Sequence, residues 1–472
     1  MTVTTTLQSS LSIDLKRHLR NSALLFVALA VPIAAHYMVP DKGATYAVLS
    51  VNGQIPVLTA PVLGLELGVL AATLLTPLAY IFLRAGPTRR RPWQIIDLTP
   101  HARSLWGLGR WIADTLTLWI LLSVLTLAGL VLSGFRLDGD ADIFQTVVAL
   151  WLPAAPSLAL IAAIRLLLDA RNLTRRWLGD VVFFFVWIAL LISGILGTTD
   201  SDTLQMTNSP MTDAFGFVSP ILGSVDYAVD AVSIGGSSNT GEAVLIDAWQ
   251  GVTNADYINS RVVWLAIAAG LAIVAGLIWA PMKTKAPKTE AKSFSRSAAI
   301  AASIPNVPFS APNPVPSGAT NYRAAILSEI KLMFRNRIWI LVLIFAAVSG
   351  LVLPFRSMAG PILFLVLIFP FTEASARWQE KTTEQFLDTL GPGRIGRTIV
   401  LVIATILVSV MVTLPATARI VEQNQMEWLP HIFFISVAMP TAIVMLGAVT
   451  RSAVTGRLLM LMTWYVYLSS AA

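Results

Sequence analysis

The sequence predicts an all-α integral membrane protein of about eleven transmembrane helices, arranged as two pseudo-repeats that are each preceded by an amphipathic interfacial helix. Hydrophobic residues make up 56% of the 472 positions and charged residues only 12%, about half the charged share of a soluble domain. Runs without Asp, Glu, Lys or Arg recur along the whole chain. Because a backbone in lipid must satisfy its own hydrogen bonds, and because these runs lack strand-like alternation, we expect helices rather than a barrel.

The uncharged runs set the positions of the predicted spans. A helix needs about 20 residues to cross the roughly 30 Å of hydrocarbon in a bilayer. Most runs approach or reach this length, and one of them completes a span that begins near Pro61. These runs are 21–40, 67–83, 115–135, 143–164, 181–199, 262–282, 338–355, 398–418 and 428–450. The spans at 357–372, which is short, and 458–472, where the chain ends, complete the set.

The basic residues predict the orientation of these spans. When the spans are threaded alternately, all but a few of the 33 Lys and Arg fall on one side, which the positive-inside rule makes cytoplasmic. The exceptions are Lys42, Arg136, Arg261, Arg356 and Arg419. We therefore expect a cytoplasmic N-terminus and an external C-terminus. The net charge of +7 then reflects helix ends that face an anionic leaflet rather than nucleic acid.

The chain divides at a low-complexity linker. Residues 283–320 open with lysines and continue into prolines among Ser, Ala and Asn, as in a flexible cytoplasmic linker. The first half, 1–282, holds about six spans and a long external loop, 198–260; the second half, 321–472, holds about five. The second half therefore lacks a counterpart of the sixth span.

Two short segments repeat at equivalent places, one before the first span and one before the seventh. The first reads Asp-Leu-Lys-Arg-His-Leu-Arg-Asn and the second Glu-Ile-Lys-Leu-Met-Phe-Arg-Asn. Each is amphipathic at helical spacing, which favours a helix in the membrane interface with its cations toward headgroups. An ordinary basic flank of a span is the alternative. The interfacial residues are Asp14, Lys16, Arg20, Glu329, Lys331 and Arg335.

A second correspondence lies in the cytoplasmic loop after the second span of each half. Both loops contain a short predicted helix, a break of the form Leu-x-Pro or Leu-Gly-Pro, and then arginines at the start of the next span. The residues that define it are Arg91, Trp93, Ile95, Asp97, Leu98 and Pro100 in the first loop, and Glu384, Phe386, Leu387, Asp388, Leu390 and Pro392 in the second.

This order of an interfacial helix, two spans and a Pro-terminated cytoplasmic helix resembles the permease subunits of type 2 ATP-binding-cassette exporters, here as two tandem halves in one chain. The resemblance implies that the segments before the first and seventh spans are elbow helices. It also implies that the two loop helices are coupling helices that dock on ATPase subunits. The function expected from it is export of a peptide, lipid-like or drug-like substrate from the cytoplasm across a bacterial inner membrane.

The resemblance also implies partners. The chain has no Gly-x-x-x-x-Gly-Lys-Ser/Thr phosphate loop, so it is not expected to be an enzyme or to hold a cofactor. ATP and magnesium would be bound by two separate ATPase subunits, with membrane lipid around the permease. The missing twelfth span leaves room for a second permease chain. With no cysteine and four scattered histidines, the sequence predicts no catalytic or metal site.

A secondary, ion-coupled carrier is the alternative function. Such carriers also combine two bundles of spans, and they need ionisable groups at bilayer depth. The candidates here are Glu66, His36, Glu373 and Arg165. Each lies within a turn or two of a predicted interface, so we expect these side chains to snorkel toward the headgroups.

Overall fold

The computed structural model describes most of the chain. The described residues are 3–41, 46–84, 102–137, 139–175, 177–196, 210–225, 227, 229, 232–238, 243–280, 322–335, 337–377, 394–450 and 453–471. Helices dominate this part of the molecule, as the sequence predicts.

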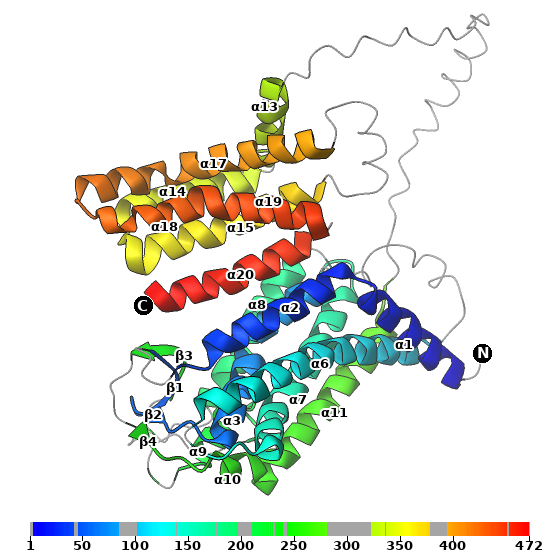
Figure 1. The fold of residues 1–472 in the computed structure, drawn as a ribbon. Helices are drawn as coiled ribbons and strands as arrows, with labels where there is room; N and C mark the ends of the chain where they lie inside the picture. The colour runs from blue at the N-terminus through cyan, green and yellow to red at the C-terminus, as the bar shows by residue number, and fades with distance from the viewer. Residues whose placement is uncertain are drawn as a thin grey trace, which may run out of the picture.

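The first half contains long helices joined by short elements (Figure 1). Its helices are α1 (Val3–Leu19), α2 (Ser22–Met38), α3 (Ala60–Thr73), α4 (Leu75–Arg84), α6 (Arg103–Arg136), α7 (Ile143–Asp169), α8 (Trp177–Leu196), α9 (Ser219–Leu222), α10 (Ala248–Thr253) and α11 (Ala255–Leu277). Its strands are β1 (Tyr46–Val51), β2 (Ile55–Pro56), β3 (Val232–Ser238) and β4 (Ala243–Val244).

The second half forms a separate group of helices in Figure 1. Its elements are α13 (Tyr322–Met333), α14 (Arg337–Val352), the π-helix η2 (Phe355–Ala359), α15 (Gly360–Arg377), α17 (Arg394–Glu422), η3 (Met426–Trp428), α18 (Leu429–Phe433), the π-helix η4 (Phe434–Ala438), α19 (Met439–Thr450) and α20 (Ala453–Ala471).

Several helices are long and apolar enough to cross a bilayer. Five meet the length and composition of a span alone, and up to seven do so if each of two bent pairs is one span. The bent pairs are α1 with α2, at 65°, and α3 with α4, at 47°. The chain is therefore built like a multi-pass membrane protein. The continuous span expected around 67–83 is instead broken between Thr73 and Leu75.

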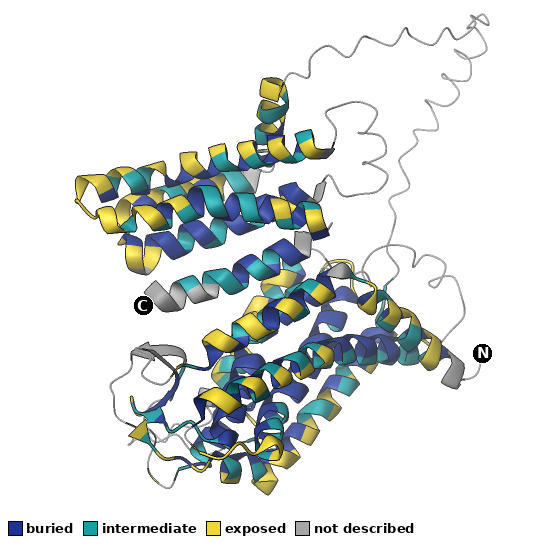
Figure 2. Cartoon of the chain, viewed as in Figure 1, coloured by how far each residue is buried: buried dark blue, intermediate teal, exposed yellow. Residues whose placement is uncertain are grey.

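Helix α7 lies at the centre of the first half and contacts α3, α6 and α11. Figure 2 shows these helices with buried inward surfaces and exposed outer ones. Small residues bring α3 against α7: a Cβ atom on Gly68 would lie 2.6 Å from the carbonyl oxygen of Leu150 and 2.7 Å from Pro153 Cγ. Close approach of backbones at small residues is a common way for helices to pack in lipid.

Helix α20 lies between the two halves (Figure 1). It contacts α2 and α4 of the first half, and α15 and α19 of the second. Its residue Leu458 belongs to the buried core of the first half, whereas Met460 and Leu461 belong to that of the second. The last predicted span is therefore the main structural link between the two cores.

The two long loops of the first half meet in small sheets. Strand β1 pairs antiparallel with β3, and β2 pairs parallel with β4. Between these strands along the chain, the segment around Asp213 is buried, and Ser157 in the middle of α7 donates a hydrogen bond of 3.0 Å to Phe215 O. Part of the loop 198–260 thus packs inside the bundle rather than beside it.

We expect Gly68→Leu to destabilise the fold, because the added side chain must force α3 away from α7. Overpacking of this kind costs about 1–3 kcal/mol. The matched control is Gly270→Leu on α11, where a Cβ atom would meet nothing within 4 Å. Thermal unfolding of the purified chain in detergent checks the prediction; equal melting temperatures for the two variants would refute the close α3–α7 contact.

Candidate functional site

Helices α1 and α6 are joined by a row of polar contacts. Ser10 Oγ donates a hydrogen bond of 3.1 Å to Trp106 O, and His18 Nε2 lies 2.7 Å from Asp114 Oδ1. Between them, Arg110 Nε lies 3.5 Å from Asp14 Oδ2. The partners keep one constant separation along the chain, so the two helices run parallel and in register, with contacts once per turn.

The row continues across the bundle as a chain of ion pairs. Arg165 on α7 lies 3.0 Å from Asp114 and 3.1 Å from Asp169. Arg84, the last residue of α4, lies 3.1 Å from the other oxygen of Asp169 and also pairs with Asp180 on α8. We call the set Asp14, His18, Arg84, Arg110, Asp114, Arg165, Asp169 and Asp180 the charge network.

Most of the charge network is excluded from solvent. The side chains of His18 and Arg165 are 0% exposed and that of Asp114 is 1% exposed, whereas Asp180 at the edge is 54% exposed. The buried part of the network contains equal numbers of carboxylates and guanidinium groups: Asp14, Asp114 and Asp169, and Arg84, Arg110 and Arg165. Because removing one partner of a buried ion pair leaves an uncompensated charge, the loss of any single member should destabilise the fold far more than the replacement of a whole pair.

Backbone carbonyl groups and aromatic rings make further contacts with the arginines of the network. Arg165 and Arg84 donate further hydrogen bonds to Leu83 O and Thr174 O. Arg110 lies 5.0 Å from the Trp106 ring and 5.3 Å from the Trp279 ring, just past the end of α11. Cations over indole faces are stabilised by the ring quadrupole. The network therefore joins α1, α4, α6, α7 and α8 with the end of α11.

The charge network brackets one of the two predicted coupling segments. Arg84 ends α4 directly before that segment, and α6 begins at Arg103 directly after it. The predicted docking residues themselves lie in 85–101 and 378–393, outside the described residues. They are Arg91, Trp93, Ile95, Asp97, Leu98 and Pro100, and Glu384, Phe386, Leu387, Asp388, Leu390 and Pro392.

The residues predicted to form elbow helices lie on α1 and α13, except for Arg20 and Arg335, which lie just past the ends of these helices. In both, the acid is buried: Asp14 is 1% exposed and Glu329 is 2% exposed. The cations Lys16, Arg20, Lys331 and Arg335 are exposed. Helix α1 packs on α6, and α13 packs on α17, which carries the buried Arg397.

The packing of α1 adds a contact that the sequence reasoning did not predict. The face that contacts α6 is a polar stripe of Thr6, Ser10, Asp14 and His18, spaced four residues apart, while Leu19 is 53% exposed. Sequence reasoning singled out the apolar face and missed this stripe. The signal was present, because Trp106, Arg110 and Asp114 repeat the same spacing on α6.

The expectation that the ionisable residues snorkel is wrong for two of them. Arg165 is 0% exposed and bound by two carboxylates, and Glu66 is 5% exposed within α3. His36 and Glu373 are exposed; His36 Nδ1 lies 2.9 Å from Arg136 Nη2, and Trp339 donates a hydrogen bond of 3.2 Å to Glu373. Hydropathy does not show whether a side chain in a span faces lipid or another helix, so it did not reveal that Arg165 and Glu66 are buried in the bundle.

Two arginines at the opposite end of the bundles cap other helices. Arg136, in the last turn of α6, donates to the carbonyl oxygens of His36 and Val39 at the end of α2. Arg419, in the last turn of α17, donates a hydrogen bond of 2.6 Å to Leu353 O just past α14. Both cations thus satisfy carbonyl groups that a helix end leaves without partners.

Within the described part of the chain, no group of three or more His, Asp or Glu side chains could hold a metal ion. The charge network offers fixed charges and tight helix contacts rather than a nucleophile with an adjacent base. Comparison with protein-family models, curated proteins and solved structures finds no match to this chain.

We expect Arg165→Met to destabilise the first half, because Asp114 and Asp169 would lose their shared cation. Breaking a buried pair in this way costs about 3–5 kcal/mol. Arg171→Met, at an exposed position just past α7, is the matched control. Thermal unfolding in detergent measures both, and adding Asp114→Asn to Arg165→Met should recover part of the loss. Equal stability of the two single variants would contradict a structural role for the network.

Proposed function

We propose that this chain is the membrane permease of an ATP-driven exporter, and that a separate ATPase subunit acts on it through segments 85–101 and 378–393. The observation that carries the proposal is the position of the charge network. Both residues that anchor segment 85–101, Arg84 before it and Arg110 after it, are fixed by buried ion pairs. A force applied to that segment would reach several helices of the first half at once.

Contiguous rigid contacts are what such transmission needs. An element that moves as a unit can switch between two arrangements, whereas a loosely held loop dissipates the displacement. From segment 85–101 the path runs through Arg84 to α7 and α8, and through Arg110 to α1. Helix α1 then acts in this proposal as an elbow helix that is clamped to the third span and moves with it.

Three features support the proposal that the two halves are equivalent. A short helix with a buried acid packs on the third predicted span of each half, α1 on α6 and α13 on α17. Arginines follow the loop segment in each half, and Arg110 and Arg397 are both buried. The last-turn arginine of that span caps the end of the first predicted span in each half, as Arg136 and Arg419 do.

In this proposal, all of the predicted spans, about eleven, cross a bacterial cytoplasmic membrane, and the N-terminus lies in the cytoplasm. Described helices lie on every predicted span, including the shorter α14 and α15. The halves are then 1–282 and 321–472, joined by the cytoplasmic linker 283–320. Two ATPase subunits would bind the ATP and magnesium that this chain is not expected to hold.

We expect the paired charge reversal Asp97→Arg with Asp388→Arg to weaken association with the ATPase, because both residues lie on predicted docking segments. Membrane insertion should be unaffected. Co-purification of the ATPase under mild detergent, from cells that express the chain at native level, measures the effect.

The matched control for this reversal is Asp140→Arg, an exposed acid in the turn between α6 and α7 at the opposite end of the helices. Recovery of equal amounts of ATPase with the paired variant and with the control would count against docking at these segments. Recovery of no nucleotide-hydrolysing protein even with the parent chain would overturn the exporter proposal itself.

One side chain favours the second candidate function, an ion-coupled carrier. Glu66 on α3 is 5% exposed, and among the described residues no Lys, Arg or His pairs with it. An unpaired carboxyl group inside a membrane bundle is typical of proton relays in pumps and carriers. In the charge network, in contrast, each buried carboxylate lies within 3.5 Å of a cationic side chain.

We expect Glu66→Gln to leave ATP-driven export unchanged, because the amide keeps the shape of a carboxyl group. Under the carrier alternative the same variant would lose transport driven by a proton gradient. Uptake into proteoliposomes, energised by ATP with the ATPase or by a pH gradient without it, separates the two functions. Gradient-driven transport by the parent chain that disappears in the variant would replace the exporter proposal.

A further inference from the structure

A large cavity lies between the two halves, beside α20. Its volume is about 690 Å³, and α2, α4, α8, α15 and α20 all contribute to its wall. This volume is within the range of about 300–1,000 Å³ that is typical of small-molecule sites. The two halves thus meet around a space rather than along a continuous packed surface.

The wall of this cavity is mostly hydrocarbon, and three of the four described polar side chains in it donate hydrogen bonds to protein groups; the fourth is Tyr37. Trp187 donates a hydrogen bond of 3.1 Å to Thr76, Trp464 one of 2.8 Å to Pro361 O, and Thr463 one of 2.9 Å to Leu459 O. Among the residues that the structure describes, none with a charged side chain lines the cavity. A ligand with polar groups would lose its hydration there and find few partners, so the cavity selects against such groups.

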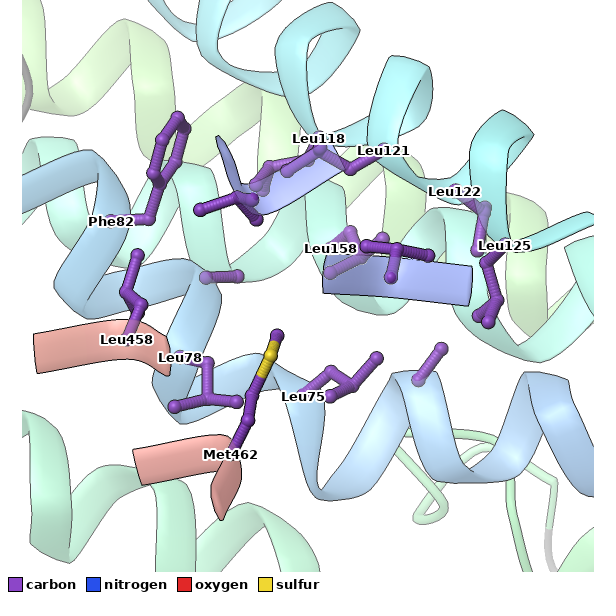
Figure 3. Close-up of a pocket in the computed structure, with 14 residues that line it drawn as sticks. Leu75, Leu78, Phe82, Leu118, Leu121, Leu122, Leu125, Leu158, Leu458 and Met462 are labelled. Atoms are coloured by element: carbon purple, nitrogen blue, oxygen red, sulfur yellow. The ribbon is translucent and has the colours of Figure 1, made fainter. Parts of the chain in front are cut away.

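A narrower pocket of about 60 Å³ adjoins the cavity on the side of the first half (Figure 3). The two share Leu75, Leu78 and Met462 in their walls. The pocket reaches between Phe82 of α4 and apolar side chains of α6 and α7, among them Leu118. Apolar cavities of this kind stay free of water and accept apolar groups. A wide chamber that leads into a narrow apolar extension fits a flexible chain better than a compact ring system.

The cavity also lies at the right height for a lipid tail. The residues of α20 that line it, Leu459 to Trp464, lie near the middle of that helix, and Leu365 and Phe369 lie near the middle of α15. Its rim includes Ile33, which is 63% exposed, and Phe184, which is 52% exposed, so the cavity opens to the outside of the bundle. In a bilayer these positions would be surrounded by acyl chains.

We propose that this cavity binds the acyl chain of an amphiphile, with the polar headgroup outside it. As an assignment of the exported substrate class, lipid-like rather than peptide, the inference rests on the exporter proposal. Binding of the chain does not, because it needs neither ATP nor an ATPase.

The experiment titrates the purified full-length chain in detergent with dibromostearic acid or with a phosphatidylcholine that carries the same brominated chain. Bromine quenches tryptophan fluorescence at short range, and Trp187 and Trp464 line the cavity. We expect saturable quenching, and its loss in the double variant W187F/W464F. Saturation by the free acid alone, by the phospholipid alone or by both supports the site and identifies the headgroup that it tolerates.

Two variants that fill the cavity and one control variant test whether the quenching arises from binding in the cavity. Ala30→Phe and Ala34→Phe each place a ring in the cavity, whereas Ala266→Phe places one on the exposed face of α11. A ring that displaces about two methylene groups of ligand should raise the half-saturating concentration roughly tenfold. Size-exclusion profiles and helical circular dichroism identify folded variants before titration.

The inference is overturned if neither probe saturates, if folded Ala30→Phe and Ala34→Phe bind as the control does, or if saturable quenching persists without Trp187 and Trp464. Because no nucleotide or ATPase is present, these results do not depend on the exporter proposal. Conversely, failure to recover an ATPase with the chain would leave the measured binding intact.

Discussion

The first half depends on one constraint: a charge removed from water inside a bundle must be paired on all its sides. One carboxylate oxygen of Asp114 contacts His18 and the other accepts a hydrogen bond from Arg165. Arg165 in turn pairs with Asp169. Apolar packing in lipid is weakly directional, since a lipid tail is as good a neighbour as a leucine. The ion pairs are directional and fix the register of α1 on α6, which apolar contacts would leave free to slide by a turn. Closely packed glycines then determine how near the helices approach.

The two halves differ in how firmly they are held. In the first half the network joins most of the helices at one end, and the paired loop strands join them at the other. The described part of the second half relies mainly on its apolar core, and two π-helices, η2 and η4, interrupt its helices. π-Helices are locally strained and often mark functional positions. Helix α20 contributes to both cores, so in the proposed exporter it would link any motion of the first half to the second.

The positions of the helices could be predicted from the sequence, whereas most contacts between them could not. Runs without charge mark the helical segments because lipid excludes charge, and described helices lie on every run that we identified. The break after Thr73 escaped notice because nothing in a hydropathy pattern changes there. Arg165 was expected to snorkel because its partner Asp114 comes from another helix, α6, whose position only the fold reveals. Its second partner, Asp169, lies four residues further along α7, and that spacing was readable in the sequence. Pairing of β1 with β3 joins segments far apart in the chain, and such contacts leave no local signal. The stripe Thr6, Ser10, Asp14 and His18 was readable, since four-residue spacing of polar groups on one helix predicts a polar partner.

The large apolar cavity between the halves can be explained by the lipid that surrounds a membrane protein. In water, such a space would collapse, because closing it removes hydrocarbon from solvent. In a bilayer the alternative occupant is an acyl chain, which fills the space at little cost, so the driving force for collapse largely disappears. Open and closed arrangements of the halves around α20 can then differ little in free energy. In the proposed exporter, a force on segment 85–101 would reach this boundary through the charge network, and the acyl chain in the cavity would belong to the cargo.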